Sequence, residues 1–320
     1  MNRRNLVLIP ILMLSVFALI SITATIPAQG ATGTLAEIED RGYLIIGSDT
    51  TYPPFEEYNA TSEQAQGFDI DLAHQVAIAL GVDLKVVTSE WDPIIPNLKS
   101  SQFDVIISAM TITAEREVEV DFTRWYYKSY QAILVPTANE FGILTETDLN
   151  ASIIIGVQSG TTSDIWVQEN LNTSVTLQTF DNILQAIAAL KQGSVDVVLG
   201  DYAVLAQDEL ESGATKVVDT YSPEDFGFAC RNGDTDLKDA LNDVIDGLLG
   251  ADENNPNPTN LYSTIYVKWF GEEAYTDAGF TGTVFDVAIE YVWYTGGAAP
   301  GFEFLLVFAI GIIPIIRRKR

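Results

Sequence analysis

The stretch YLIIGSDTTYPPFEE, residues 43–57, describes a β-strand that runs directly into a polar turn. Residues 43–46 are apolar and β-prone, and Asp49, Tyr52 and two prolines follow them. Proline fixes φ and removes a backbone donor, so it ends strands and favours turns. The sequence therefore predicts a strand over 43–47 that presents an acid and an aromatic ring at its carboxyl end.

The composition restricts the classes of partner. The chain has 320 residues, with 17 basic and 44 acidic side chains and a net charge of −27. Six of the basic residues lie at the two ends, at positions 3, 4 and 317–320. Such an acidic body lacks the basic surface that a nucleic-acid backbone requires, so we expect no nucleic-acid partner. Its acidity is typical of a solvated surface.

Cysteine and histidine are each present once, as Cys230 and His74. A single cysteine cannot form an internal disulfide, and its strand-like surroundings predict a buried structural thiol. A single histidine leaves no multi-histidine metal site, and its place in the helical run DIDLAHQVAIAL argues against a histidine-based catalytic triad. We therefore expect no bound metal and no cofactor.

Both ends of the chain carry apolar segments. Arg3 and Arg4 precede an apolar run and the small-residue site Ala28-Gln29-Gly30, the layout of a secretory signal peptide at 1–30. An uncleaved anchor is the alternative. Residues 298–316 are apolar except for Glu303 and reach the ~20 residues that span a membrane. The basic residues at 317–320 match the positive-inside rule. The sequence thus predicts an exported body anchored at the outer face of the membrane.

Strands and helices alternate along the body. We predict strands at 43–47, 82–87 and 104–107 with helices at 67–80, 92–99 and 114–118, and a second series of strands at 153–157, 175–180 and 195–200 with helices at 162–170, 181–192 and 201–210. Helices at 236–249 and 259–270 return to the first series. This order predicts an α/β fold of two lobes joined by two crossing strands, with a ligand cleft between the lobes. We expect lobe 1 at 35–133 and 227–272, lobe 2 at 134–226, a stalk at 273–299, a C-terminal membrane or sorting segment at 300–320, and hinges at 130–135 and 225–228.

Polar residues follow four of the predicted strands, at the edge where open α/β sheets bind ligands. An arginine fork binds a carboxylate, and free N–H groups at a helix start also favour an anion. Aspartates favour a cation, and aromatic rings offer flat surfaces. A carboxylate beside an ammonium group is an α-amino acid. The candidate residues are Asp49, Tyr52, Trp91, Thr111, Arg116, Thr161, Thr162 and Asp201.

Each candidate also has a purely structural interpretation. Arg116 fits an exposed helix position, Asp201 fits a helix N-cap, Thr161 and Thr162 fit a capping pair, and Trp91 fits a core position. Taken one at a time, these interpretations are at least as good as a binding role. Four strand ends that converge on one zwitterion favour the binding site.

The motifs GSDTTYPPFE, GFDIDLA, WDPIIPNLKSSQFDVIISAMTITAERE, VDFTRWYY, GVQSGTTSD and KWFG carry a family resemblance. From about Leu35 to Gly271 the chain resembles extracellular solute-binding proteins of the polar amino-acid type, the receptor components of ABC importers. The resemblance implies the periplasmic-binding-protein fold, in which two α/β lobes close on the ligand.

The resemblance also implies roles for individual residues. Arg116 and Thr111, with the amide of Thr162, would hold the ligand's α-carboxylate, and Asp201 would hold its α-ammonium group. The side chain would lie between Tyr52 and Trp91, and its far end would meet Asp49 and Gln158. Position 109 departs from the family, because Ala109 stands where relatives often carry glycine or serine. The implied ligand-binding set is Asp49, Tyr52, Trp91, Ala109, Thr111, Arg116, Gln158, Thr161, Thr162 and Asp201.

The C-terminal sequence PGFEFLLVFAIGIIPIIRRKR carries a second resemblance. It is similar to the archaeal surface-sorting tail, in which a Pro-Gly-Phe motif precedes an apolar span and a basic end. In that class the tail is removed and a lipid anchor replaces it. A retained transmembrane helix is the alternative, and both place the protein at the outer face of the membrane.

Together these features predict a receptor without enzymatic activity that delivers a polar or basic L-amino acid to the membrane subunits of an ABC transporter. One alternative is a dehydratase on the same fold, which needs a positioned general acid or base such as Glu57 or Asp49. A sensory ectodomain is another alternative. Arginine, lysine, histidine and glutamine all remain open as ligands.

Overall fold

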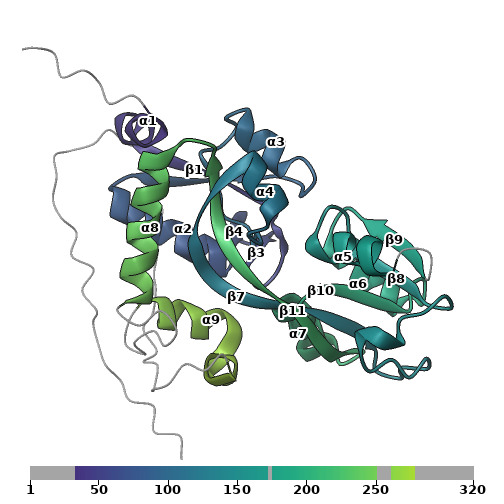
Figure 1. Ribbon diagram of the computed structural model, residues 1–320. Helices are drawn as coiled ribbons and strands as arrows, with labels where there is room; N and C mark the ends of the chain where they lie inside the picture. Colours follow the sequence, from purple (N-terminus) through teal and green to yellow (C-terminus); the bar gives the residue numbers. More distant parts are fainter. Residues whose placement is uncertain (1–32, 172–174, 251–260, 278–320) are drawn as a thin grey trace, which may run out of the picture. The chain divides into compact units, whose positions relative to one another are not determined.

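The computed structural model of the chain describes residues 33–171, 175–250 and 261–277 (Figure 1). The predicted signal peptide at 1–30 and C-terminal segment at 300–320 lie outside the described residues, as does the predicted stalk beyond residue 277. Within these ranges, no helix has the length and apolar character needed to cross a membrane.

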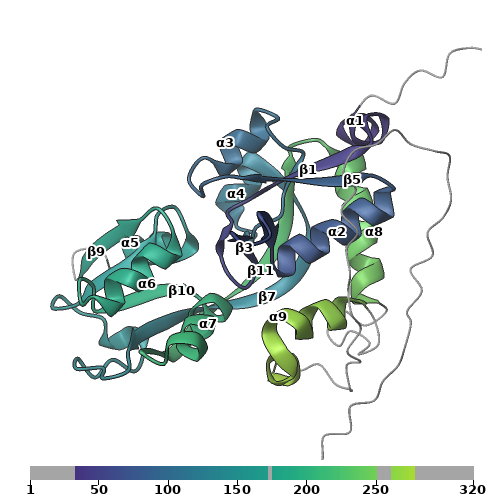
Figure 2. The ribbon, with the colours of Figure 1, turned by 180° about the vertical axis from the view of Figure 1, so that it is seen from behind.

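Two long antiparallel strands, β7 (Val120–Pro136) and β11 (Thr215–Arg231), run through the centre of an eight-stranded sheet with the order β5-β1-β6-β11-β7-β10-β8-β9. On one side, β1 (Tyr43–Ser48) pairs in parallel with β5 (Asp83–Thr88) and β6 (Val105–Ile106). On the other side, β8 (Ile154–Gln158) pairs in parallel with β9 (Thr176–Phe180) and β10 (Val197–Asp201). We call these sides the first and the second lobe. The predicted α/β fold, two lobes joined by two crossing strands, is confirmed (Figures 1 and 2).

Helices cover both lobes close to the predicted positions. The first lobe carries α1 (Thr34–Arg41), α2 (Phe68–Leu80), α3 (Ile94–Lys99), α4 (Ala114–Glu119), α8 (Thr235–Leu249) and α9 (Leu261–Asp277). The second lobe carries η1 (Glu146–Asp148), α5 (Thr162–Asn170), α6 (Ile183–Lys191) and α7 (Tyr202–Ser212). Helix α9 extends past the predicted end at residue 270 because it continues beyond a kink at Gly271, where φ is 83°. Helix α1 was not predicted.

A small second sheet follows β1, where the sequence indicated only a turn. It consists of β2 (Thr51–Tyr52), β3 (Glu56–Asn59) and β4 (Gln64–Gln66). These strands are too short, and too rich in polar residues, to show an alternating apolar pattern in the sequence. Their pairing buries Phe55 and Glu56 completely, so an acid enters the interior of the first lobe.

An aromatic cluster fixes both crossing strands to the first lobe. The Phe55 ring lies 4.9 Å from Tyr127 of β7, 5.4 Å from Phe226 of β11 and 5.3 Å from Phe270 of α9. Phe68 of α2 lies 5.0 Å from Phe270. Offset and edge-on ring pairs of this kind add about 0.5–1.5 kcal/mol each beyond the burial of their surface. The hairpin that begins at the opening sequence motif is therefore part of the core.

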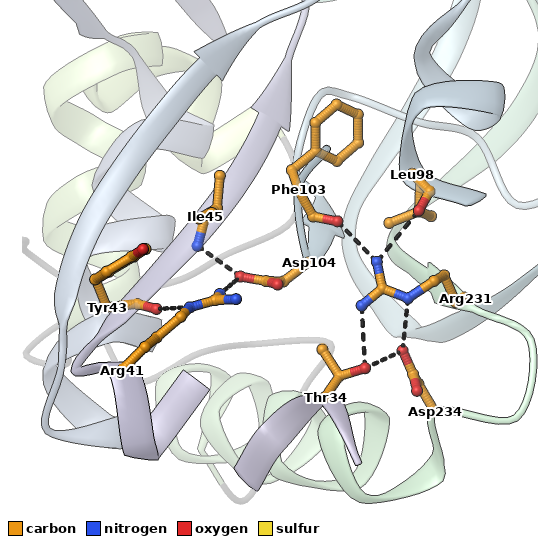
Figure 3. Close-up of polar contacts among 9 residues, drawn as sticks. All are labelled: Thr34, Arg41, Tyr43, Ile45, Leu98, Phe103, Asp104, Arg231 and Asp234. Atoms are coloured by element: carbon orange, nitrogen blue, oxygen red, sulfur yellow. Dashed lines mark hydrogen bonds and ion pairs between the residues drawn. The ribbon is translucent and has the colours of Figure 1, made fainter. Parts of the chain in front are cut away.

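A polar network at the opposite end of the first lobe fixes the end of β11 (Figure 3). The Arg231 guanidinium donates to the carbonyl oxygens of Phe103 at 2.8 Å and Leu98 at 3.2 Å. It also donates to Thr34 Oγ1 at 3.0 Å and pairs with Asp234 at 3.2 Å. One side chain thus ties α1, α3 and the start of β6 to the returning strand.

We expect Arg231→Met to lower the free energy of unfolding by about 2–4 kcal/mol. The substitution leaves the two carbonyl oxygens and the partly buried Asp234 without their cationic donor. Lys99→Met is the matched control, because Lys99 pairs with Glu119 where both side chains are half exposed, and such pairs contribute about 0–1 kcal/mol. Urea denaturation measures the free energy of unfolding of both variants. Equal losses in the two variants would show that the Arg231 network is not a structural anchor.

Candidate ligand-binding site

A cavity with about 300 Å³ of space free of protein atoms lies at the carboxyl edge of the sheet. The structure brings all ten predicted ligand-binding residues into the lining of this single cavity and adds Glu56 and Ser108. The lining residues are Asp49, Tyr52, Glu56, Trp91, Ser108, Ala109, Thr111, Arg116, Gln158, Thr161, Thr162 and Asp201.

Arg116 supplies a positive charge to the cavity. Its Nη1 donates to the carbonyl oxygen of Thr111 at 2.8 Å, and its guanidinium lies over the Trp91 ring at 5.1 Å. Among the described residues, no carboxylate lies within ion-pair distance of it. Burial lowers the pKa of Arg116, and the more distant Glu224 and Asp201 carboxyls act in the opposite direction. The cavity therefore contains a guanidinium that can still accept an anionic partner.

Asp201 ends β10 and lies at the other side of the cavity. It occupies the N-cap position of α7 but makes no side-chain capping bond. Instead its carboxyl accepts from the Tyr52 hydroxyl at 2.6 Å and from Ser129 Oγ and Gln131 Nε2 at 3.1 Å each. Burial, and then the nearby Glu224, raise the pKa of Asp201 to about 8. The structural interpretation of Asp201 as a helix cap therefore fails.

Asp49 makes contacts within its own turn and across the cavity. Its Oδ1 accepts from Thr51 Oγ1 at 2.6 Å, whereas its Oδ2 accepts from Gln158 Nε2 of the second lobe at 2.8 Å. Burial raises the pKa of Asp49. Gln158 is 2% exposed, and its Oε1 has no hydrogen-bond partner among the described residues. A buried acceptor without a donor is costly, so this oxygen calls for a donor from a ligand.

Several polar contacts cross between the lobes around the cavity. Besides the Tyr52–Asp201 and Asp49–Gln158 bonds, Trp91 Nε1 donates to the carbonyl oxygen of Gly160 at 3.1 Å. Gly160 has a φ of 68°, and a Cβ there would lie 2.7 Å from Asp92 Oδ1, so this close approach requires glycine. One face of the Trp91 ring is occupied by Arg116, which is a contact that the sequence did not indicate.

A buried pair of acids, Glu56 and Asp69, lies behind the cavity. Ser108 Oγ donates to Glu56 Oε1 at 2.7 Å, and the Ala109 amide and the Tyr126 hydroxyl each donate to Asp69 Oδ2 at 2.7 Å. The remaining oxygens, Glu56 Oε2 and Asp69 Oδ1, have no hydrogen-bond partner among the described residues. The charge of Asp69 acts on Glu56, and two buried carboxyls that interact in this way favour sharing one proton. Burial raises the pKa of Glu56 well above its usual value and that of Asp69 to about 7.

The acid pair fixes the turn that follows β6. Ala109 has a φ of 40°, a left-handed conformation that costs a residue with a Cβ about 1–2 kcal/mol. Asp69 holds this conformation by accepting the Ala109 amide, and Ser108 bridges Glu56 to the amide of Asp49 at 2.8 Å. The sequence signal for this role was Asp69 in GFDIDLA. An acid at the start of a helix is usually explained by a favourable contact with the helix dipole, so its role in the site was missed.

Glu224 of β11 is a further acid that the sequence did not indicate. Its Oε2 accepts from Thr111 Oγ1 at 2.6 Å and from Thr162 Oγ1 at 3.1 Å. Glu224 is only 9% exposed. Thr161, by contrast, has the structural role considered above, because its hydroxyl caps α5 by accepting the Asp164 amide.

Comparisons with known proteins agree with this geometry. A model of the bacterial extracellular solute-binding proteins, family 3, matches residues 44–272. The L-cystine-binding protein of Escherichia coli strain K12 is 31% identical over 248 residues, covering 75% of this chain and 87% of that protein. The ABC transporter arginine-binding protein 1 of the same organism is 32% identical over 231 residues, covering 70% and 89%. The crystal structure of an ancestral amino acid-binding protein, a precursor of cyclohexadienyl dehydratase, matches with a TM-score of 0.68 and 37% identity over 74% of this chain and 99% of that one.

We expect Glu56→Gln to change how stability depends on pH. The raised pKa values of the pair mean that the folded state binds its proton more tightly than the unfolded chain, whose carboxyls titrate near ~4. This contribution is full below about pH 4 and is lost as the pH rises through about 7. A glutamine donates to Asp69 without a titratable proton, so the variant should gain stability relative to the native protein between pH 5 and pH 8.

Urea denaturation at pH 5 and pH 8 measures this difference, with Glu57→Gln as the control on the neighbouring residue. The control should follow the native protein at both pH values. Parallel pH dependences for Glu56→Gln and the native protein would contradict the shared proton.

Proposed function

The chain belongs to family 3 of the bacterial extracellular solute-binding proteins, and we propose that its cavity binds an L-amino acid with a polar or basic side chain. The observation that supports this most directly is a buried guanidinium without a carboxylate partner in the same cavity as two buried aspartates. A zwitterion supplies a carboxylate for the guanidinium and an ammonium group for an aspartate. The curated relatives that bind cystine and arginine belong to the same chemical class of ligand.

In this proposal the ligand's α-carboxylate binds Arg116. The guanidinium has five N–H donors, and one of its nitrogens is bonded to the Thr111 carbonyl. The amide of Thr162 opens helix α5 and adds a donor at the positive end of the helix dipole. These groups come from both lobes, so a bound carboxylate would connect the lobes.

The α-ammonium group binds Asp201. Three hydrogen bonds, from Tyr52, Ser129 and Gln131, already orient this carboxyl. Burial and the nearby Glu224 raise its pKa to about 8, and the charge of Arg116 offsets this rise only in part. A bound ammonium group would favour the ionised form and thereby release a proton at neutral pH.

The side chain of the ligand extends toward Asp49 and Gln158. The unpartnered Gln158 Oε1 calls for an N–H donor, which arginine, lysine and glutamine all provide. The Asp49 carboxylate adds a preference for a positive charge, because a cation compensates an anion that burial has made unfavourable. We therefore propose a basic amino acid as the preferred ligand and glutamine as a weaker one.

We propose that the protein is a receptor and not a dehydratase. Glu56 is an acid that bears a proton and lines the cavity, so it is the group that an enzyme could use. Its proton, however, is shared with the buried Asp69, and its other oxygen accepts from Ser108. A general acid must direct its proton at the substrate, and this one does not.

Delivery and location complete the proposal. We propose that the loaded receptor docks on the membrane subunits of an ABC transporter at the outer face of the cell. The basic and apolar run at the N-terminus supports export, and the Pro-Gly-Phe motif with its apolar span and basic end supports an archaeal-type C-terminal anchor.

Thermal-shift screening of the twenty amino acids, followed by titration calorimetry, tests the binding function. We expect a basic amino acid to give the largest shift. A turnover assay with arogenate and prephenate tests the alternative enzymatic role. Turnover of either compound, with no amino acid stabilising the protein, would show that the protein is an enzyme and not a receptor.

Arg116→Met should weaken the binding of the best amino acid by about 10²–10³·⁵-fold. Loss of one partner of a buried charge pair typically costs about 3–5 kcal/mol. Arg124→Met is the control, because Arg124 pairs with Asp246 outside the cavity. Calorimetry on both variants decides the assignment, and a change below about fivefold for Arg116→Met would remove Arg116 from the carboxylate site.

Asp49→Asn separates a side-chain contact from a local structural role. If Asp49 pairs with the ligand's side chain, affinity for arginine and lysine should fall more than affinity for glutamine, because only the basic ligands lose a charge partner. Dissociation constants for arginine, lysine, histidine and glutamine, measured on both proteins, provide the test. A uniform shift across the four ligands would show that Asp49 only supports its own turn.

A further inference from the structure

We infer that Glu224 competes with the ligand's carboxylate for the hydroxyl groups of Thr111 and Thr162, which both donate to it. The inference rests on the proposed function and adds a residue that sets affinity for the α-carboxylate. Glu224 lies on β11 directly opposite Ser129 of β7.

The number of available hydrogens makes the competition unavoidable. A threonine hydroxyl has one hydrogen and can donate it to one acceptor at a time. Thr111 and Thr162 both donate to the same oxygen of Glu224, at 2.6 and 3.1 Å. A ligand carboxylate that approaches Arg116 can receive these two hydrogens only if Glu224 gives them up.

Charge adds to this competition. Glu224 is nearly buried, and among the described residues it has no ion pair with a cationic side chain. Its charge acts on the Arg116 guanidinium from a longer distance, where it opposes the lowering of the Arg116 pKa by burial. A ligand carboxylate bound between Arg116 and the two threonines would therefore meet a second carboxylate near the same guanidinium, and like charges in a site of low dielectric repel each other.

The structure also provides a place for Glu224 to move. Thr111 and Thr162 line both the ligand cavity and a larger hollow, with about 1190 Å³ of space free of protein atoms, and Glu224 lines that hollow. The hollow is wider and more open, so a displaced carboxylate can be hydrated there. Its other acids, Glu115, Glu169 and Asp225, make it unfavourable for a second anion, and no basic side chain is among its lining residues.

The bridge has a second consequence, because its two hydroxyls come from different lobes. Thr111 follows β6 of the first lobe, and Thr162 opens α5 of the second. Glu224 therefore makes the contact between the lobes that a ligand carboxylate at Arg116 would make. Ligand binding would exchange this internal carboxylate for an external one.

Glu224→Gln should raise affinity for arginine by about tenfold or more, because the variant keeps the shape of the side chain and loses the competing charge. Argininamide lacks the carboxylate, so its affinity should change by less than about threefold. The same comparison is made with glutamine and glutaminamide. Asp225→Asn is the matched control, since it removes one charge from the next, exposed residue, and it should leave all four affinities unchanged.

Titration calorimetry gives these constants, and circular dichroism verifies folding. Glu224→Asp is the second variant, because its shorter carboxylate cannot reach both hydroxyls and should also raise arginine affinity. Unchanged or weaker arginine binding in both variants would overturn the inference while leaving the proposed function intact. If none of the probes binds the native protein or either variant, both the proposed function and the inference fail.

Discussion

The pairing of β7 with β11 is the constraint on which the rest of the structure depends. The two strands stay in register from Val120 opposite Arg231 to Pro136 opposite Thr215, with irregularities between. Each strand also pairs with the sheet of one lobe, because β11 pairs with β6 of the first lobe and β7 pairs with β10 of the second. The same pairing that connects the lobes therefore places Ser129, Gln131 and Glu224 in contact with side chains that line the cavity.

The register of these strands explains why the site contains groups from distant parts of the sequence. Asp201 of β10 lies directly opposite Gln131 of β7, so the side chains are neighbours on one face and Gln131 donates to the aspartate. Glu224 lies opposite Ser129, which donates to the same aspartate. A shift of one residue in either ladder would turn these side chains to the other face of the sheet.

The cavity accommodates an unusual number of buried acids, and each is compensated differently. Glu56 and Asp69 share a proton, and two hydroxyls bind Glu224. Three donors surround Asp201, and Thr51 and Gln158 donate to Asp49. Arg116 is the one basic side chain among the described residues that line the cavity, which also include Asp49, Glu56 and Asp201. Acidic groups therefore outnumber basic groups there, which agrees with the proposed basic ligand.

Sequence reasoning predicted the parts of the fold that local patterns encode. Strand β1, helix α2 with its glycine stop, and the polar ends of β8 and β10 all follow from periodicity and turn residues. Eight of the ten predicted site residues follow from the topology of an open α/β sheet, and the family resemblance added Ala109 and Gln158. Their individual roles toward a ligand stay predictions.

The missed residues share a different cause. Glu224 sits in the polar stretch TYSPED and is buried only because β11 pairs with a strand about 90 residues earlier in the chain. Glu56 is buried by a hairpin whose strands are two to four residues long, below the length at which alternation is visible. Ser108 enters the site because it donates to Glu56 and accepts the amide of Asp49. Burial of a polar residue by non-local pairing leaves no periodic signal in a single sequence.

The contacts between the lobes involve side chains to which we assign ligand roles. Tyr52 bonds Asp201, Gln158 bonds Asp49, and Thr111 and Thr162 meet at Glu224. A ligand that exchanges these hydrogen bonds for similar ones gains little, because the number of hydrogen bonds stays nearly constant. Arg116 and Asp201 are different, since among the described residues neither has an oppositely charged side chain at ion-pair distance. We therefore propose that the net free energy of binding is concentrated in the two charges of the α-amino acid backbone, and that the exchanged hydrogen bonds determine which side chain is accepted.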